Sequence, residues 1–189
     1  GTGTPHDPGT GTPHDPSGPI ISVDDPRLTP TQRDAAVSLI AASTAAMAKF
    51  TDVASVEAAG YRSIGDASTG FEHFVNWTYF SDSISLDPDR VESIVFTVAP
   101  DGTRTIASAM YILPLGKTMT DVPEIAGELT TWHDHQNLCW DLTGTPHVVG
   151  LTDAFGNCAR GQFIATPPML HVWMTPTACG PFSGIEGVH

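Results

Sequence analysis

The segment SIVFTVAPDGTRTIASAMYIL, residues 93–113, decides the fold. Large apolar side chains alternate with smaller or polar ones along residues 93–98 and again along 103–113. A period of two is typical of a β-strand, because successive side chains of a strand point to opposite faces of its sheet. Pro100, Asp101 and Gly102 lie between the two runs and favour a tight turn. We therefore predict an antiparallel hairpin here.

Further segments with strand character flank this hairpin. The run FEHFVNWTYF, residues 71–80, alternates in the same way and is expected to place His73 and Val75 on one face. Gly/Pro clusters separate three later candidates, which are residues 129–140, 147–151 and 169–174. The second half of the chain therefore consists mainly of predicted strands.

The residues before these strands are typical of helices. Thr29 and Gln32 form a capping-box pattern around Pro30, which suits the first position of a helix. We expect this helix to continue to about Lys49, followed by a short second helix over residues 52–60. Residues at helical spacing on its predicted inner face are Val37, Ile40, Thr44 and Met47.

Helices followed by a run of strands indicate an α+β fold. We predict one domain over residues 19–189, in which the N-terminal helix pair packs on one face of an antiparallel sheet. Whether that sheet curves far enough to form a barrel stays open at this point.

A low-complexity arm precedes the predicted domain. Residues 1–16 repeat GTGTPHDP twice, and we assign residues 1–18 to this arm. Its Gly, Thr and Pro content is typical of a flexible or polyproline-like spacer. Alternatives are weak metal binding by its two His-Asp pairs, contact with a cell wall, and docking on a neighbouring subunit of a homo-oligomer.

The charge of the chain excludes several kinds of partner. Eight Lys and Arg residues stand against 21 Asp and Glu, so the net charge is −13 with neutral histidine. Nucleic acids and anionic membrane surfaces need a basic face, and the sequence has no basic cluster. The longest uncharged helical stretch, residues 35–48, is shorter than the roughly 20 residues that cross a bilayer. We therefore expect neither a nucleic-acid partner nor membrane insertion.

The strongest chemical signal is the sequence Trp-His-Asp-His at residues 132–135. On a strand, His133 and His135 would share a face about 7 Å apart, within reach of one ion. His73 and His171 lie in similar strand contexts, and Glu72 beside His73 is a further candidate ligand. Imidazole ligands suit a divalent transition metal, with copper or zinc favoured over iron or nickel.

Two classes of function stay open on this evidence. The first is an extracytoplasmic metal-binding protein, which could be a carrier, a sequestering protein or a metal-dependent enzyme. The second is a cell-surface or extracellular structural protein that assembles through its N-terminal arm. In the second case the strand histidines would be ordinary hydrogen-bonded residues of the sheet. The sequence alone does not decide whether any catalysis occurs.

The cysteines indicate the compartment. Cys139, Cys158 and Cys179 allow three alternative single disulfides, each of which leaves one thiol over. We favour the pair Cys139–Cys158, which closes a modest loop. A disulfide, few lysines and a Thr/Pro/Gly-rich start fit a secreted or cell-surface bacterial protein.

An ordered series of motifs lies within residues 50–182. Its segments are VASVEAAGYRSIGD (53–66), GFEHFVNW (70–77), LDPDRVESIVF (86–96), ASAMYILP (107–114), TTWHDHQNLC (130–139), MLHVWM (169–174) and CGPF (179–182). This series resembles a broad set of uncharacterised exported proteins that is frequent in actinobacteria. Val91 and Phe74 depart from the pattern, which has Pro and Tyr there. The resemblance implies an exported domain and supplies no activity.

Overall fold

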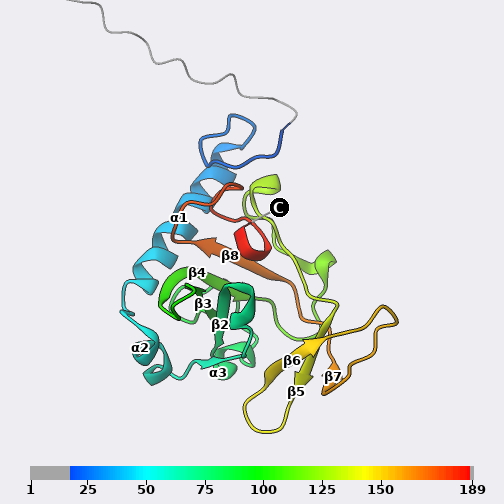
Figure 1. Ribbon diagram of the computed structural model, residues 1–189. Coiled ribbons are helices and arrows are strands. Elements are labelled where there is room, and N and C mark those ends of the chain that lie inside the picture. The colour runs from blue at the N-terminus through cyan, green and yellow to red at the C-terminus, as the bar shows by residue number, and fades with distance from the viewer. Residues whose placement is uncertain (1–17, 188–189) are drawn as a thin grey trace, which may run out of the picture.

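The computed structural model describes residues 18–187 (Figure 1). The predicted repeat arm falls outside these residues except for its last position. The helices are α1 (Pro30–Met47), α2 (Val53–Ala58) and α3 (Trp77–Phe80). The strands are β1 (Arg62–Ser63), β2 (Phe71–Val75), β3 (Ser93–Val98), β4 (Arg104–Ile112), β5 (Leu138–Asp141), β6 (His147–Leu151), β7 (Gln162–Phe163) and β8 (Met169–Trp173).

The strands form two antiparallel sheets. The larger has the order β1-β2-β3-β4-β8, and the smaller has the order β6-β5-β7. The predicted hairpin is confirmed as β3 and β4, which pair from Ser93 with Met110 to Val98 with Arg104. The α+β class is therefore confirmed. Within residues 18–187 neither sheet closes into a barrel.

Helix α1 begins where the capping pattern predicted. The Thr29 side chain accepts a hydrogen bond from the Gln32 N–H, and the Gln32 side chain accepts one from the Thr29 N–H at 3.0 Å. The predicted inner face is right at Met47, which is buried, and at Ile40, which packs against the core. It is wrong at Val37, which is 48% exposed whereas Ala36 beside it is fully buried. The buried residues of this helix are mostly small, so they allow it to lie close to the sheet.

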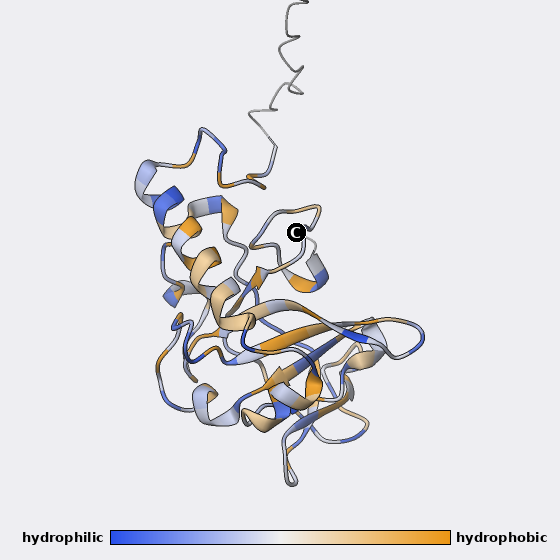
Figure 2. Ribbon diagram, turned by 90° about the vertical axis from the view of Figure 1, so that its left-hand side faces the viewer, coloured by the Kyte–Doolittle hydropathy of each residue, from blue (hydrophilic) through white to orange (hydrophobic). Residues whose placement is uncertain are grey.

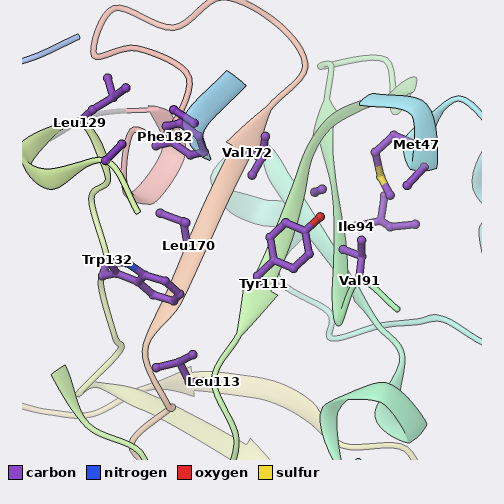
Figure 3. Packing of buried hydrophobic residues seen from close by; sticks show 14 of the residues in the cluster. Met47, Val91, Ile94, Tyr111, Leu113, Leu129, Trp132, Leu170, Val172 and Phe182 are labelled. Carbon is purple, nitrogen blue, oxygen red and sulfur yellow. The ribbon is translucent and has the colours of Figure 1, made fainter. Parts of the chain in front are cut away.

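One face of the large sheet packs against α1, which lies along that side in two perpendicular views (Figures 1 and 2). Figure 3 shows this core, in which Tyr111 of β4 and Leu170 of β8 lie among side chains from the helix and from later loops. The Tyr111 hydroxyl forms a buried hydrogen bond of 2.7 Å with the Ser43 hydroxyl of α1. This bond satisfies two polar groups that would otherwise be costly to bury.

The small sheet lies away from α1, on the other side of the large sheet (Figure 1). Trp140 of β5 and Val148 of β6 pack with Val75 of β2, so the two sheets share a cluster. The predicted disulfide is confirmed, because Cys139 of β5 bonds to Cys158 in the connection between β6 and β7. A disulfide is typical of proteins that mature in an oxidising compartment.

Two predicted strands are shorter than expected. The run 71–80 is a strand only to Val75, because the Asn76 side chain accepts hydrogen bonds from the N–H groups of Thr78 and Tyr79 and so begins helix α3. The run 129–140 is a strand only from Leu138, and His133 before it forms an isolated β-bridge with Met169.

Among the described residues no helix is both long enough and apolar enough to cross a membrane.

Candidate functional site

All four predicted histidines come together on the face of the large sheet that is opposite α1. The ring centres of His133 and His171 are 5.1 Å apart. His73 lies 5.8 Å from His171, and His135 lies 5.7 Å from His133, again between ring centres. We call these four side chains the histidine cluster. They come from β2, β8 and the irregular segment before β5, so the fold brings together residues almost 100 positions apart in the sequence.

The sheet must curve to bring His73 and His171 together. Their strands, β2 and β8, are separated by β3 and β4. At about 4.8 Å per strand, a flat sheet would hold β2 and β8 roughly 14 Å apart. The register of the β3–β4 pair shifts between Val95 and Phe96, where Ala107 of β4 is the extra residue of a β-bulge at the centre of the sheet. Because bulges increase twist and bending, this one favours the curvature that brings the rings within contact.

The ring of His73 is oriented by Asp66, which precedes the 3-10 turn Ala67–Thr69. The Asp66 carboxylate accepts a hydrogen bond of 2.6 Å from Nδ1 of His73 and one of 3.0 Å from the backbone N–H of the same residue. A neutral His73 that donates from Nδ1 carries its lone pair on Nε2. This carboxylate–histidine arrangement is the one that commonly supports metal-binding imidazoles.

The ring of His171 is oriented by Ser108 on the neighbouring strand β4. The Ser108 hydroxyl donates to the Ala109 carbonyl at 2.8 Å, so its oxygen is left to accept from Nδ1 of His171 at 3.2 Å. This network assigns the proton of a neutral His171 to Nδ1 and the lone pair to Nε2.

His133 shows the same pattern with a weaker partner. Its Nδ1 lies 3.5 Å from the Thr131 carbonyl oxygen, which can only accept. Its Nε2 is buried and has no hydrogen-bond partner among the described residues. Nε2 of His133 is therefore a buried nitrogen whose natural partner, a proton donor or a metal ion, is not supplied by residues 18–187.

Burial favours the uncharged form of His133, His135 and His171 by lowering the pKa of each ring. It lowers the pKa of His133 to about 4, with a smaller contribution from the nearby His135. Burial also lowers the pKa of His171 well below its ordinary value and lowers that of His135, and in both cases His73 adds to the effect. Neutral imidazole is the form that coordinates metals, so the site does not have to lose protons before binding.

Glu72, the further candidate ligand, lies elsewhere. It alternates with His73 along β2 and therefore faces the opposite side of the sheet. Its carboxylate accepts hydrogen bonds from Ser63 and Arg104, at 2.6 and 2.5 Å. The ion pair with Arg104 accounts for the burial of Glu72, which is not a member of the histidine cluster.

The four rings of the histidine cluster do not surround a common metal position in this structure. Within residues 18–187 no group of three or more His, Cys, Asp or Glu side chains is positioned to hold a metal. The rings of His133 and His171 are parallel to within 2°, a stacked arrangement. The spacing nevertheless fits, because two imidazoles on one tetrahedral ion at about 2 Å per Zn–N bond would have ring centres about 5 Å apart. Coordination would need the stacked rings of His133 and His171 to change their relative orientation, and the His133 ring is held by the weakest Nδ1 contact, of 3.5 Å.

A cavity of about 1110 Å³ opens beside the cluster and lies between the two sheets. His73, His135 and His171 line it, together with apolar side chains such as Trp77 of α3 and Trp140 of β5. A ligand in this cavity can therefore reach three of the four histidines.

Sequence reasoning missed two residues that orient the rings. Asp66 lies seven positions before His73, and nothing in the sequence links the two until the turn at residues 67–69 is known. Ser108 faces His171 across the β4–β8 pair, where the registered partners are Ser108 with Trp173 and Met110 with His171. Only the strand pairing could have indicated that contact.

The chain matches no protein-family model, and no curated protein or solved structure is significantly similar to it. The geometry of the site is therefore the main guide to the function of this protein.

Proposed function

We propose that the histidine cluster binds a divalent transition metal ion. One observation carries the proposal: in His73, His133 and His171 an acceptor engages Nδ1, so the Nε2 lone pair of each neutral ring remains for a ligand. Three such nitrogens from neighbouring segments are the donor set of many zinc and copper sites. His135 is available as a fourth ligand.

Copper or zinc is favoured by this donor set. Neutral imidazole nitrogens suit Cu²⁺ and Zn²⁺, and they also accept Fe²⁺ and Ni²⁺ with lower affinity. A closed site with four histidines would suit a carrier or a sequestering protein. Three histidines with an open fourth position would suit an enzyme, since a bound water could then be activated. The adjoining cavity supports the second arrangement, because a substrate could enter from it.

We further propose that the protein works outside the cytoplasm. The disulfide supports this location, as does the resemblance of the ordered motifs to exported bacterial proteins. An acidic chain with net charge −13 also attracts cations rather than polyanions.

The test is a metal titration of the purified full chain. The apo protein is prepared with a chelator, and Zn²⁺ and Cu²⁺ are added separately while heat is recorded by calorimetry. The double variant His73→Gln with His133→Gln should lose at least 100-fold in affinity, because two of the three oriented nitrogens are removed.

The matched control is His147→Gln. His147 also lines the cavity, but its Nδ1 bonds to the Thr145 carbonyl and its ring is not among those in contact with the cluster. Both variants contain the repeat arm, so any weak metal binding by His6 and His14 contributes equally to the two titrations. A stoichiometric site that survives in the double variant, or that is lost in His147→Gln, would refute the proposal.

A further inference from the structure

The cavity between the two sheets has the properties of an organic-ligand site. Its volume of about 1110 Å³ is slightly above the roughly 300–1,000 Å³ typical of small-molecule sites. Its wall is mainly apolar and includes Phe71, Trp77, Phe80, Ile112, Leu138 and Trp140. A ligand that fills much of this space must itself be largely apolar.

The exposed part of the cavity lining is apolar as well. Five of the lining side chains are large, hydrophobic and more than a third exposed: Leu115, Leu142, Leu151, Ile164 and Ile185. Exposed apolar side chains that gather around one cavity mark an interaction site more often than scattered ones do.

The wall favours aromatic rings over acyl chains. Trp77 contacts Phe80 and Trp140 edge-to-face, with ring centres 5.3 and 6.3 Å apart. Aromatic side chains can make the same edge-to-face or offset contacts with a flat aromatic ligand. Each such contact contributes binding free energy beyond that of the apolar area it buries.

The polar end of the ligand is set by the histidines. Nε2 of His73 and of His171 are acceptors in the tautomers that Asp66 and Ser108 impose. Both residues line the cavity. Trp77 and Trp140, which also line the cavity, hold buried Nε1 donors that have no partner among residues 18–187. A hydroxyl can both donate and accept, so it complements this wall better than a carbonyl or a carboxylate, which only accept.

The charge around the cavity argues for a neutral molecule. Its charged lining side chains are Arg160 and Glu186, of opposite sign, and Asp66, which is engaged by His73. An ionic head group would lose its hydration without a net opposite charge to replace it.

We propose that this cavity binds a neutral aromatic molecule that carries a hydroxyl group, with its rings against the exposed faces of Trp77 and Trp140 and its hydroxyl on the histidine cluster. The inference uses the histidines of the proposed metal site but does not need the ion. A hydroxyl would donate to Nε2 in the apo protein and could ligate a metal in the loaded protein.

The test compares three probes of nearly equal shape by calorimetry, on the full chain in the presence of a chelator. Naphthol should bind about three- to tenfold more tightly than methylnaphthalene, since one hydrogen bond separates them. Naphthoate should bind more weakly than either. Equal binding of naphthol and methylnaphthalene, preferential binding of naphthoate, or no binding of any probe would each overturn the proposal.

Two variants locate the probe. Gly150 lines the cavity, and a Cβ added there would meet no atom within 4 Å, so Gly150→Phe should reduce naphthol affinity at least tenfold without loss of fold. Ile84→Phe, at an exposed position outside the cavity lining, is its control. In His73→Leu with His171→Leu, which removes both acceptors, the preference for naphthol over methylnaphthalene should disappear, while His147→Leu should retain it. Retained naphthol affinity in Gly150→Phe would place the probe elsewhere and overturn the assignment.

The two titrations distinguish failure of the metal-site proposal from failure of the organic-ligand proposal. Naphthol binding under chelation without any metal binding would leave only the organic site standing. Metal binding without naphthol binding would leave only the metal site standing.

Discussion

Asp66 binds His73 through both of its carboxylate oxygens. Oδ1 accepts the backbone N–H at 3.0 Å, and Oδ2 accepts Nδ1 of the ring at 2.6 Å. The first contact fixes the position of the strand relative to the turn at residues 67–69, and the second fixes the tautomer of the ring. One side chain thus couples the local backbone to the direction in which His73 presents its lone pair.

Asp66→Asn should therefore separate orientation from folding. Asn keeps an oxygen for the backbone N–H but turns an NH₂ group toward Nδ1, which then must accept and shift its proton to Nε2. We expect metal affinity to fall about 10- to 100-fold with little change in the far-ultraviolet circular dichroism. Competition with a chelator of known affinity measures the loss.

Asp134→Asn is the control for this experiment, because Asp134 lies within the same segment as His133 and accepts a hydrogen bond from Gln136. Its metal affinity should stay within about threefold of wild type. Equal losses in the two variants would mean that general electrostatics, rather than the orientation of His73, governs binding.

The buried carboxyl group of Glu92, which directly precedes β3, should make the stability of the fold depend on pH. Glu92 is 1% exposed, and one carboxyl oxygen accepts the Ile112 N–H at 3.1 Å while the other has no partner among the described residues. Burial raises the pKa of Glu92 to about 8, and Asp82 and Asp87 contribute to the increase. The folded protein therefore holds a proton that the unfolded chain releases at lower pH.

Glu92→Gln should stabilise the protein at high pH. Between the unfolded pKa of 4.5 and the folded pKa of about 8, the unfolded state binds fewer protons, so wild-type stability falls as pH rises. At about 1.4 kcal/mol per pKa unit, the loss amounts to a few kcal/mol. Urea unfolding at pH 4 and pH 8 should show a gain for Glu92→Gln only at pH 8. The exposed Glu57→Gln is the control, and a gain of equal size at both pH values would contradict the prediction.

Removal of the disulfide Cys139–Cys158 should lower the free energy of unfolding of the protein. Cys139 and Cys158 are 19 residues apart, and closing a loop of that length stabilises a fold by about 3 kcal/mol in the chain-entropy treatment. We expect Cys139→Ser with Cys158→Ser to lose about this much free energy of unfolding in urea. Cys179→Ser removes the remaining thiol and should leave the unfolding midpoint close to wild type. Similar losses in both variants would show that the bond itself contributes little.

The parts of the fold that the sequence predicted are those with strong local signals. The capping pattern of Thr29 and Gln32 and the alternation around the 100–102 turn depend on neighbouring residues, so they can be recognised without tertiary information. The strand predicted to Phe80 failed for a local reason too. The Asn76 cap outweighs the strand preference of three aromatic residues that follow it.

The site was predicted less completely because its geometry depends on pairing between distant strands. Alternation indicates that His73 and His171 lie on strands, whereas the face that each occupies in the common sheet depends on the strand pairing; the structure places these rings 5.8 Å apart. Their approach across four strands requires a curved sheet, which the alternation does not reveal. The same limit applies to Val37, since the exposed and buried positions of an alanine-rich helix differ too little in hydrophobicity to fix its rotation.

His133→Gln should reduce the sensitivity of the fold to acid. Burial lowers the pKa of His133 to about 4, below the 6.5 of an unfolded histidine. As pH falls from 6.5 to 4, the unfolded chain gains a proton that the folded protein does not, so stability is lost over this range. The free energy of unfolding of His133→Gln relative to that of wild type should therefore rise by a few kcal/mol between pH 7 and pH 4. Chemical unfolding of the apo protein at pH 7, 6, 5 and 4 measures this difference. His147→Gln, outside the cluster, serves as the reference. If the wild-type and His133→Gln curves stay parallel over this range, the ring of His133 is not held in the desolvated position that the cluster requires.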